Sequence, residues 1–235
     1  MAELVDAAPA RALAIYAHPD DPEVSCGGTL ARWAGAGTEV HVVICCQGDK
    51  GTSEPGGDGA ELSRRRAAEV AAASRVLGVA GHHLLGYPDG ELDNSTDARR
   101  RLVEVIRRLK PDAVVCPDPT AAFFGRSYVN HRDHRVAGWL ALDAVAPAAR
   151  LPLYFPDAGP PHRVAAIYLS GTLEPDVWVD VSETIDAKAE ALLCHESQLG
   201  EAGEWLRTAV RERAEQAGRA VGVRYAEGFR LLYPS

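Results

Sequence analysis

Residues 13–28, LAIYAHPDDPEVSCGG, join a short apolar run to a cluster of one histidine and two adjacent aspartates. The first five of these residues have the character of a buried strand, and residues 29–36 carry apolar side chains at helical spacing. His18, Asp20 and Asp21 therefore lie where a predicted strand passes into a predicted helix. Because ligands bind at the carboxyl ends of strands in open α/β sheets, we expect a metal site here, with one aspartate as a ligand and the other as a base.

Strand-like and helix-like segments alternate outward from this stretch. The predicted strands share short apolar or β-branched runs and cover residues 13–17, 39–46, 82–85, 113–116, 165–170, 177–181 and 225–233. The predicted helices share apolar stripes at spacings of three and four and cover residues 29–36, 61–77, 97–109, 132–146, 185–196 and 204–217. This alternation predicts an α/β fold, a Rossmann-like three-layer sandwich with a mostly parallel sheet. We expect one domain over residues 1–235, with residues 1–11 as a flexible tail.

A second polar cluster, NHRDH at residues 130–134, follows an irregular polar stretch, residues 117–130, and begins a predicted helix. His131 and His134 are three residues apart, so they share one face of the helix start. Two imidazoles and a carboxylate from two strand ends are enough for a catalytic zinc site with water at the open position. A carboxylate beside the ligands would act as the base, and either aspartate of the first cluster could take that role.

The composition argues against several classes of partner. A formal net charge of −8 disfavours nucleic acid and anionic membranes, and no apolar run is long enough to span a bilayer. The acidic N-terminal segment does not have the pattern of a signal peptide. Five cysteines without Cys-x-x-Cys spacing argue against a disulfide framework and a thiolate zinc site, so we expect a cytoplasmic protein.

The two clusters, AHPDDPEVSCGGTLARWA at residues 17–34 and NHRDHRVAG at residues 130–138, resemble the PIG-L/LmbE-type zinc-dependent de-N-acetylases. That family includes N-acetylglucosaminyl-phosphatidylinositol deacetylase and the deacetylases of mycothiol and bacillithiol synthesis. The resemblance continues through four supporting segments, QGDKG (47–51), RAAE (66–69), GYPDG (86–90) and KAEALLCHESQ (188–198). It implies an LmbE-like fold and covers most of the chain.

The resemblance assigns roles that residue chemistry leaves open. It implies that His18, Asp21 and His134 hold one Zn²⁺, or another divalent metal. It implies that Asp20 is the general base that activates water and then returns a proton to the leaving amine. It also implies that protonated His131 stabilises the developing oxyanion.

Three further residues receive roles from the same resemblance. Asp133 would orient His131 and raise its pKa, as a carboxylate partner does. Arg66 matches the arginine of an R-x-x-E motif and would bind a substrate hydroxyl or phosphate. Asp89 would hydrogen-bond sugar hydroxyls.

Three positions depart from the family pattern. Pro22 replaces the acid that commonly follows the aspartate pair, with Glu23 directly after it, and this variant is not expected to affect the ligands. Val129 stands where some members have a tyrosine that helps the oxyanion, so Tyr128 or another loop residue would have to supply that hydroxyl. Arg132 replaces a common proline and is expected to add positive charge at the mouth of the site, which favours an anionic substrate.

These features together predict a zinc-dependent hydrolase. Metal-activated water would remove an N-acetyl or other N-acyl group from an amino sugar or its conjugate, cleaving a linear amide C–N bond. One alternative is an amidase acting on thiol conjugates or other small amides, and another is a non-catalytic zinc-binding protein, which the presence of Asp20 and His131 disfavours. The expected partner is a small sugar-like N-acyl substrate, with no nucleic acid and no membrane, and by resemblance the chain forms a homo-oligomer.

Overall fold

The structure is a computed structural model that describes residues 2–53, 55–199 and 203–234. The strands of its main sheet are β1 Glu3–Leu4, β2 Arg11–Tyr16, β3 Glu39–Cys46, β4 Gly81–Tyr87, β5 Ala113–Pro117, β8 Ala166–Ser170, β9 Val177–Asp180 and β10 Ala226–Leu232. The helices are α1 Asp21–Gly35, α2 Gly59–Leu77, α3 Thr96–Leu109, α4 Arg132–Asp143, α5 Ile185–Leu193, α6 Glu196–Leu199 and α7 Gly203–Gly218. A π-helical segment, η1 Ala144–Ala149, continues α4.

The sheet has the strand order β1-β9-β10-β8-β5-β2-β3-β4. Strands β4, β3, β2, β5 and β8 pair in parallel, whereas β10 is antiparallel to both β8 and β9. The predicted Rossmann-like fold with a mostly parallel sheet is confirmed. After β2 the chain builds outward to β3 and β4 on one side, and it returns to β5 on the other. The gap between the carboxyl ends of β2 and β5 is therefore the topological switch point, where α/β folds bind ligands.

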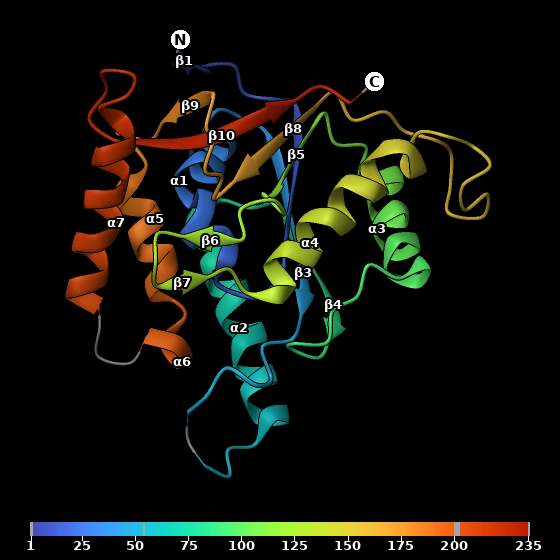
Figure 1. The fold of residues 1–235 in the computed structure, drawn as a ribbon, viewed down its shortest axis with the longest axis horizontal. Helices are drawn as coiled ribbons and strands as arrows, with labels where there is room; N and C mark the ends of the chain where they lie inside the picture. The colour runs from blue at the N-terminus through green and yellow to red at the C-terminus, as the bar shows by residue number, and fades with distance from the viewer. Residues whose placement is uncertain (1, 54, 200–202, 235) are drawn as a thin grey trace.

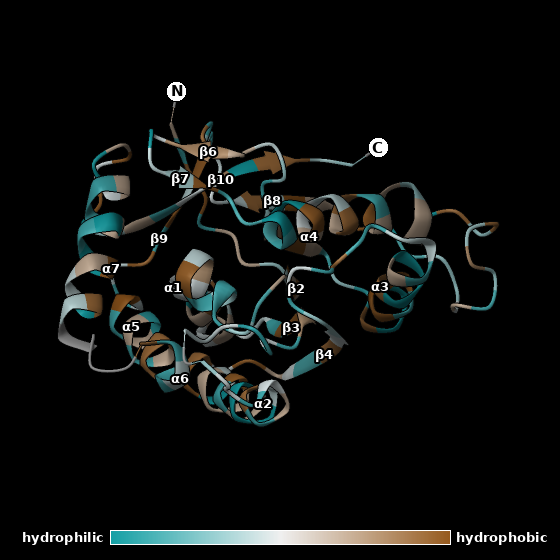
Figure 2. Ribbon diagram, turned by 60° about the horizontal axis from the view of Figure 1, so that its bottom comes forward, coloured by the Kyte–Doolittle hydropathy of each residue, from teal (hydrophilic) through white to brown (hydrophobic). Residues whose placement is uncertain are grey.

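Helices cover both faces of the sheet. α1, α2, α5 and α7 lie on one face, and α3 and α4 lie on the other (Figures 1 and 2). The central strand β2 serves both cores, because its side chains alternate between the faces. Leu13 and Ile15 pack in the core beneath α3 and α4, whereas Ala14 and Tyr16 pack in the core beneath α1 and α2.

Helix α1 begins earlier than predicted, at Asp21 instead of residue 29. Pro22 is tolerated in its first turn, because the N–H that proline lacks has no helical partner there. The helix is kinked at Cys26, whose φ is −145° and ψ is 21°. Beyond the kink the N–H groups of Gly28 and Thr29 donate to the carboxylate of Glu227 from β10, at 3.1 and 2.7 Å.

Two segments without predicted structure contain short strands. In the expected tail, β1 pairs in parallel with the edge strand β9, because that edge still offers unpaired backbone groups. In the expected loop, β6 Phe123–Phe124 and β7 Tyr128–Val129 form an antiparallel hairpin, and Gly125 turns it with a φ of +59°. Met1, at the start of the expected tail, and Glu54, between β3 and α2, lie outside the described residues.

Two other predictions differ at helix ends. The helix predicted over residues 132–146 ends at Asp143, where η1 continues it. The helix predicted over residues 185–196 ends at Leu193, and α6 follows as a separate short helix.

The cysteines are free, and Cys45, Cys46 and Cys116 are buried as small apolar side chains. Among the described helices, none combines the length and apolar character needed to cross a membrane.

Candidate metal centre

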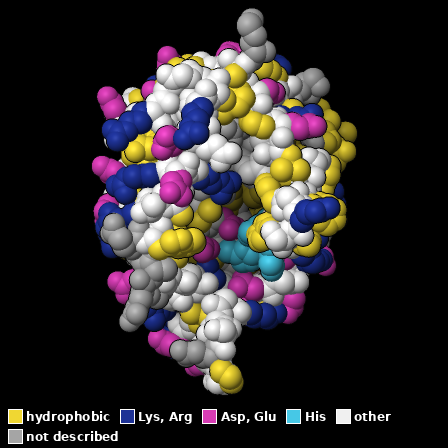
Figure 3. Space-filling model, turned by 60° about the vertical axis from the view of Figure 1, so that its left-hand side comes forward, with side chains coloured by type: hydrophobic (Ala, Val, Ile, Leu, Met, Phe, Trp, Pro, Cys, Tyr) yellow, Lys and Arg dark blue, Asp and Glu magenta, His cyan; other side chains and the backbone are white. Residues whose placement is uncertain are grey.

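The two polar clusters meet at the carboxyl edge of the sheet. His18 follows β2 and Asp21 begins α1, whereas His131 and His134 lie at the start of α4, which follows β5 and the β6–β7 hairpin. Because β2 and β5 are paired neighbours, these segments converge at the switch point. Figure 3 shows histidine side chains gathered in a hollow of the surface, with acidic side chains beside them.

Three donor groups face one another in this hollow. His18 Nδ1 lies 3.1 Å from His134 Nε2 and 3.5 Å from Asp21 Oδ2, and His134 Nε2 lies 3.1 Å from Asp21 Oδ1. Tetrahedral ligands about 2.0–2.1 Å from a zinc ion are roughly 3.3 Å apart. The spacing of the two imidazoles and the carboxylate therefore fits one zinc ion.

The outer nitrogen of each imidazole has a partner of its own. His134 Nδ1 donates to Asn130 Oδ1 at 3.0 Å, and His18 Nε2 lies 3.4 Å from Asp133 Oδ2. These contacts favour a proton on the outer nitrogens and leave the two inner nitrogens with lone pairs for a metal. Asn130 is itself fixed, since its amide donates to the Ala121 carbonyl at 2.8 Å.

The same cluster attracts positive charge. Burial lowers the pKa of His18, but Asp133 and Asp21 outweigh burial and raise that pKa to about 10. Burial raises the pKa of Asp21, but His134 and His18 outweigh it and hold the pKa well below its usual range. The metal-free site therefore retains a proton that a divalent cation would replace.

Two other donor sets overlap with this one. Donor atoms lie within 4.8 Å of one another in the groups His18, His131, His134 and His18, Cys46, Asp89. The set that contains Asp21 is tighter, because each of its donor pairs lies within 3.5 Å. Burial raises the pKa of Cys46 and so favours the protonated thiol in the metal-free protein.

Asp20, the expected base, is held by a buried arginine. Arg66 is 3% exposed, and its Nη2 donates to Asp20 Oδ1 at 2.9 Å. Its Nη1 also reaches the Gly48 carbonyl, at 3.5 Å. The resemblance assigns Arg66 to the substrate, and in the structure its guanidinium bonds to the proposed base and to a backbone carbonyl. The side chain of Asp20 is 25% exposed and therefore remains accessible to water.

Asp133 lies closer to His18 than to His131, the residue it was expected to orient. Its buried carboxylate is 3.4 Å from His18 Nε2 and 3.9 Å from His131 Nδ1, and it accepts the Gly90 N–H at 2.6 Å. The expectation of a raised pKa for His131 needs correction, since burial and His18 lower that pKa more than Asp133 raises it. His131 Nδ1 accepts the Asp133 N–H at 3.2 Å, so the neutral ring carries its proton on Nε2.

One cavity of about 470 Å³, here named the catalytic cavity, collects most of these side chains. The residues assigned from sequence that line it are His18, Asp20, Asp21, Arg66, Asp89, His131 and His134. Asp133 lies behind them. Two further side chains that line the cavity, Lys50 and Gln198, were not predicted as site residues. Both belong to segments that carry the resemblance, QGDKG and KAEALLCHESQ, and this was the signal that could have indicated them.

Two polar side chains near the mouth are engaged within the protein. Asp89 accepts the Gly48 N–H at 2.9 Å and faces the Lys50 N–H at 3.4 Å, so it ties the loop after β3 to the turn after β4. Its role toward sugar hydroxyls stays a prediction. Arg132 donates to the Leu92 carbonyl and pairs with Asp93, so its charge is already partly balanced at the mouth.

A buried carboxylate–imidazole pair between α1 and the segment after α5 was not expected from the sequence. Glu23 Oε2 lies 3.4 Å from His195 Nε2, and both side chains are buried. Burial raises the pKa of Glu23, and His195 opposes that rise. The pair links the first turn of α1 to the segment between α5 and α6.

Comparison with known proteins identifies the family. The family model described as GlcNAc-PI de-N-acetylase (PIG-L) matches residues 13–145, which include both polar clusters. The chain belongs to the PIG-L de-N-acetylase family. Diacetylchitobiose deacetylase from Thermococcus kodakarensis is 35% identical to this family member, over 94% of the chain and 83% of the relative.

Solved structures show the same fold. The N,N'-diacetylchitobiose deacetylase from Pyrococcus horikoshii matches with a TM-score of 0.87 and 33% identity, over 96% of this chain and 84% of that one. The 4-carboxy-2-hydroxymuconate hydratase from Pseudomonas putida matches with a TM-score of 0.79 and 26% identity, over 96% of this chain and 97% of that one. The family fold thus occurs in proteins named for two different reactions.

Proposed function

We propose that this PIG-L family protein is a zinc-dependent N-deacetylase that acts as one domain on an amino sugar or an amino-sugar conjugate. The observation that carries the proposal is the arrangement of His18, Asp21 and His134 around one point, with Asp20 in the same cavity. The relatives named diacetylchitobiose deacetylase support an N-acetylated sugar as the substrate.

The chain's own residues supply the proton transfers. Zinc, when held by His18, Asp21 and His134, would polarise the acetyl carbonyl and lower the pKa of water toward about 7. Asp20 takes a proton from the attacking water and returns it to the leaving nitrogen as the C–N bond breaks. His131 donates its Nε2–H to the oxygen that gains negative charge.

Polar side chains around the cavity would orient the sugar. Lys50 and Gln198 line the catalytic cavity beside Asp89. Hydrogen-bonding groups that converge on a concave site fix the orientation of a polar ligand, so we assign the acylated ring to this cavity. Arg66 then has a second role, because its bond to Asp20 positions the base.

Acetate release tests the proposal. Wild-type protein loaded with zinc should release acetate from N-acetylglucosamine or N,N'-diacetylchitobiose. Asp20→Asn should lower kcat by about 10²- to 10⁴-fold and keep its zinc, because it removes the base and leaves the ligands. The variant His134→Ala should lose both zinc and activity. His82 is an exposed histidine on β4, so the control variant His82→Ala should keep both.

The alternatives give different results in the same assay. A hydratase would consume an unsaturated acid and release no acetate, and an amidase for thiol conjugates would prefer thiol-containing amides. A non-catalytic zinc protein would bind the metal and hydrolyse no acylated substrate.

Zinc is the expected metal, and metal analysis of the purified protein tests it against other divalent ions. The homo-oligomer and the cytoplasmic location stay predictions, and light scattering tests the first.

A further inference from the structure

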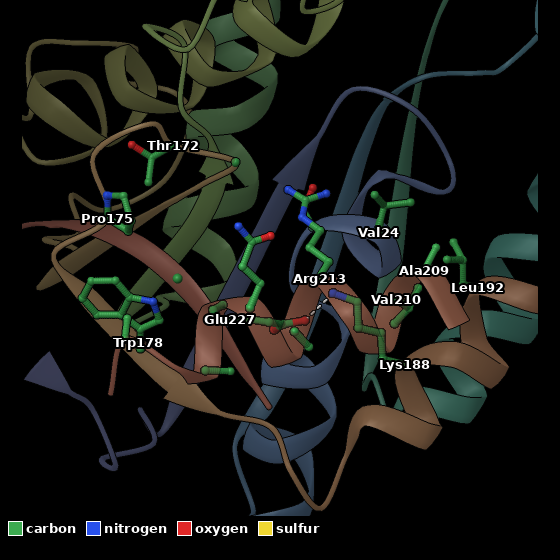
Figure 4. A pocket seen from close by; sticks show the side chains of 18 of the residues that line it. Val24, Thr172, Pro175, Trp178, Lys188, Leu192, Ala209, Val210, Arg213 and Glu227 are labelled. Atoms are coloured by element: carbon green, nitrogen blue, oxygen red, sulfur yellow. Dashed lines mark hydrogen bonds and ion pairs between the residues drawn. The ribbon is translucent and has the colours of Figure 1, made fainter. Parts of the chain in front are cut away.

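A cavity of about 480 Å³, here named the α7 cavity, is enclosed by α7, α5 and the strands β9 and β10 (Figure 4). Trp178 and Pro175 lie on one side of it, and Val210 and Leu192 lie on the other. Among the residues that the structure describes, none lines both this cavity and the catalytic cavity. Its volume falls within the range of about 300–1,000 Å³ that small-molecule sites occupy. The α7 cavity therefore has the size of a ligand site of its own.

A buried ion pair interrupts the mostly apolar wall of the α7 cavity. Lys188 Nζ donates to Glu227 Oε1 at 2.5 Å, as the dashed line in Figure 4 marks, and both side chains are buried. The carboxylate of Glu227 also accepts the N–H groups of Gly28 and Thr29, so both of its oxygens are engaged. Lys188 has three N–H donors, and in the described part of the chain only Glu227 accepts from them. The pair therefore has donors to spare for a ligand.

A second cation, Arg213, also lines the α7 cavity. It is an exposed residue of α7, and it has no hydrogen bond or ion pair with any residue that the structure describes. Arg211, two residues earlier on the helix, pairs instead with Asp186. The charged side chains of the described lining are two cations and one carboxylate, so their formal charge is +1. One negative charge on a ligand would balance it.

Two classes of uncharged ligand fit this lining less well. A sugar would bring its hydroxyl groups against alanine, valine and leucine side chains, and hydroxyls that lose water without gaining a partner cost free energy. A neutral apolar molecule would cover the spare donors of Lys188 and Arg213 without satisfying them, which is also costly. A carboxylate on an apolar body avoids both costs.

We propose that the α7 cavity binds a monocarboxylate that carries an aromatic, apolar body. The carboxylate accepts charge-assisted hydrogen bonds from Lys188 and Arg213, which are about twice as strong as neutral ones. The aromatic body packs against Val210 and gains further from the indole of Trp178. This inference is independent of the deacetylase proposal, because its residues lie outside the catalytic cavity.

Binding of 4-phenylbutyrate to the zinc-loaded protein tests the proposal, with 4-phenylbutanol as its neutral counterpart. Titration calorimetry should show binding of the carboxylate and about tenfold or more weaker binding of the alcohol. The variant Arg213→Gln should bind the carboxylate about fivefold more weakly, because one of the two cations is lost. Arg211→Gln is the matched control and should bind as the wild type does, since Arg211 lies on the same helix and does not line the cavity.

A substitution that fills the cavity gives a second test. Ala217 is a partly buried residue of α7 that lines the cavity. Ala217→Leu adds apolar bulk there and keeps the charges of Lys188 and Arg213, so it should lower the affinity for 4-phenylbutyrate by about tenfold or more. Thermal melts and zinc content show whether this variant is folded, and an unchanged affinity in the folded variant would overturn the proposal.

A carboxylate can also bind a metal ion, and the variant His134→Ala distinguishes the two sites. Binding in the α7 cavity should persist in His134→Ala, whether or not the wild-type protein hydrolyses an acylated sugar. Loss of binding in that variant would place the carboxylate at the metal centre and overturn the proposal. Equal affinities for 4-phenylbutyrate and 4-phenylbutanol, or an unchanged affinity in Arg213→Gln, would overturn it as well.

Discussion

The buried guanidinium of Arg66 donates a hydrogen bond to Asp20, the proposed base. Arg66→Met keeps much of the side-chain volume but removes the bond to Asp20, so we expect kcat to fall by about tenfold or more with a small change in KM. A residue that only bound substrate would raise KM and leave kcat unchanged. Steady-state kinetics distinguish the two roles. Arg65→Met is the matched control, because Arg65 is 53% exposed and pairs with Glu69.

A double variant sharpens this prediction. If Arg66 acts through Asp20, adding Arg66→Met to Asp20→Asn should cause little further loss, because the two residues form one unit. Independent, multiplicative losses would contradict the positioning role.

His18 links metal binding to pH. Its pKa in the metal-free protein is raised to about 10, above the ordinary value of 6.5, so His18 is protonated at pH 8. Zinc requires the neutral imidazole, so binding at pH 8 should release about one proton, and zinc affinity should rise with pH up to about 10. Titration calorimetry in buffers of different ionisation enthalpy measures that proton. Asp133→Asn should reduce the release, and equal release in both proteins would contradict this account.

At the residue scale, the two histidine–aspartate motifs predicted one shared site, and their residues His18, Asp20, Asp21, His131 and His134 all line the catalytic cavity. They did not predict which side chain supports which. Arg66 meets Asp20 across 46 residues of sequence, and Asp133 meets His18 across 115 residues. Such pairings depend on how strands and helices pack, so a motif read along the chain does not contain them.

At the scale of elements, α1 approaches its neighbours closely at Gly28, just after the kink at Cys26. A Cβ at Gly28 would lie 2.8 Å from Val181 Cβ and 3.2 Å from Glu227 Oε1. Gly28→Ala should therefore destabilise the protein by about 1–3 kcal/mol, as overpacking does. Gly35→Ala in the same helix meets no neighbour within 4 Å and should be neutral or stabilising by up to about 1 kcal/mol. Denaturant midpoints of the two variants check this, and equal midpoints would argue against a tight contact.

The same helix shows which elements a sequence can predict. Helices α2 and α3 have continuous apolar stripes and local N-caps, Asp58 and Ser95, so their positions were predicted closely. The start of α1 was missed because Pro22 and the paired glycines interrupt its pattern. The group that caps its second half, Glu227, lies 199 residues from Gly28. The β6–β7 strands have two residues each, too few to show a period.

At the scale of the whole molecule, a bound metal would join two distant parts of the chain. Zinc at 100 times its Kd should add about 2.7 kcal/mol of stability, which corresponds to a rise in Tm of about 5–10 °C for a chain of this size. Thermal melts with zinc and with a chelator measure the shift. His134→Ala should show no zinc-dependent rise, and a rise of the same size would contradict the ligand assignment.

The position of the site at the switch point also orders events during synthesis. His18 and His134 are 116 residues apart, and β5 must pair with β2 before they meet. Ribosomes add residues at about 5–20 per second, so the first cluster emerges several seconds before its counterpart. During that interval the nascent chain has two of the proposed metal ligands, His18 and Asp21, and lacks the third, His134. We therefore expect metal acquisition to follow the docking of β5, as a late step in the maturation of the protein.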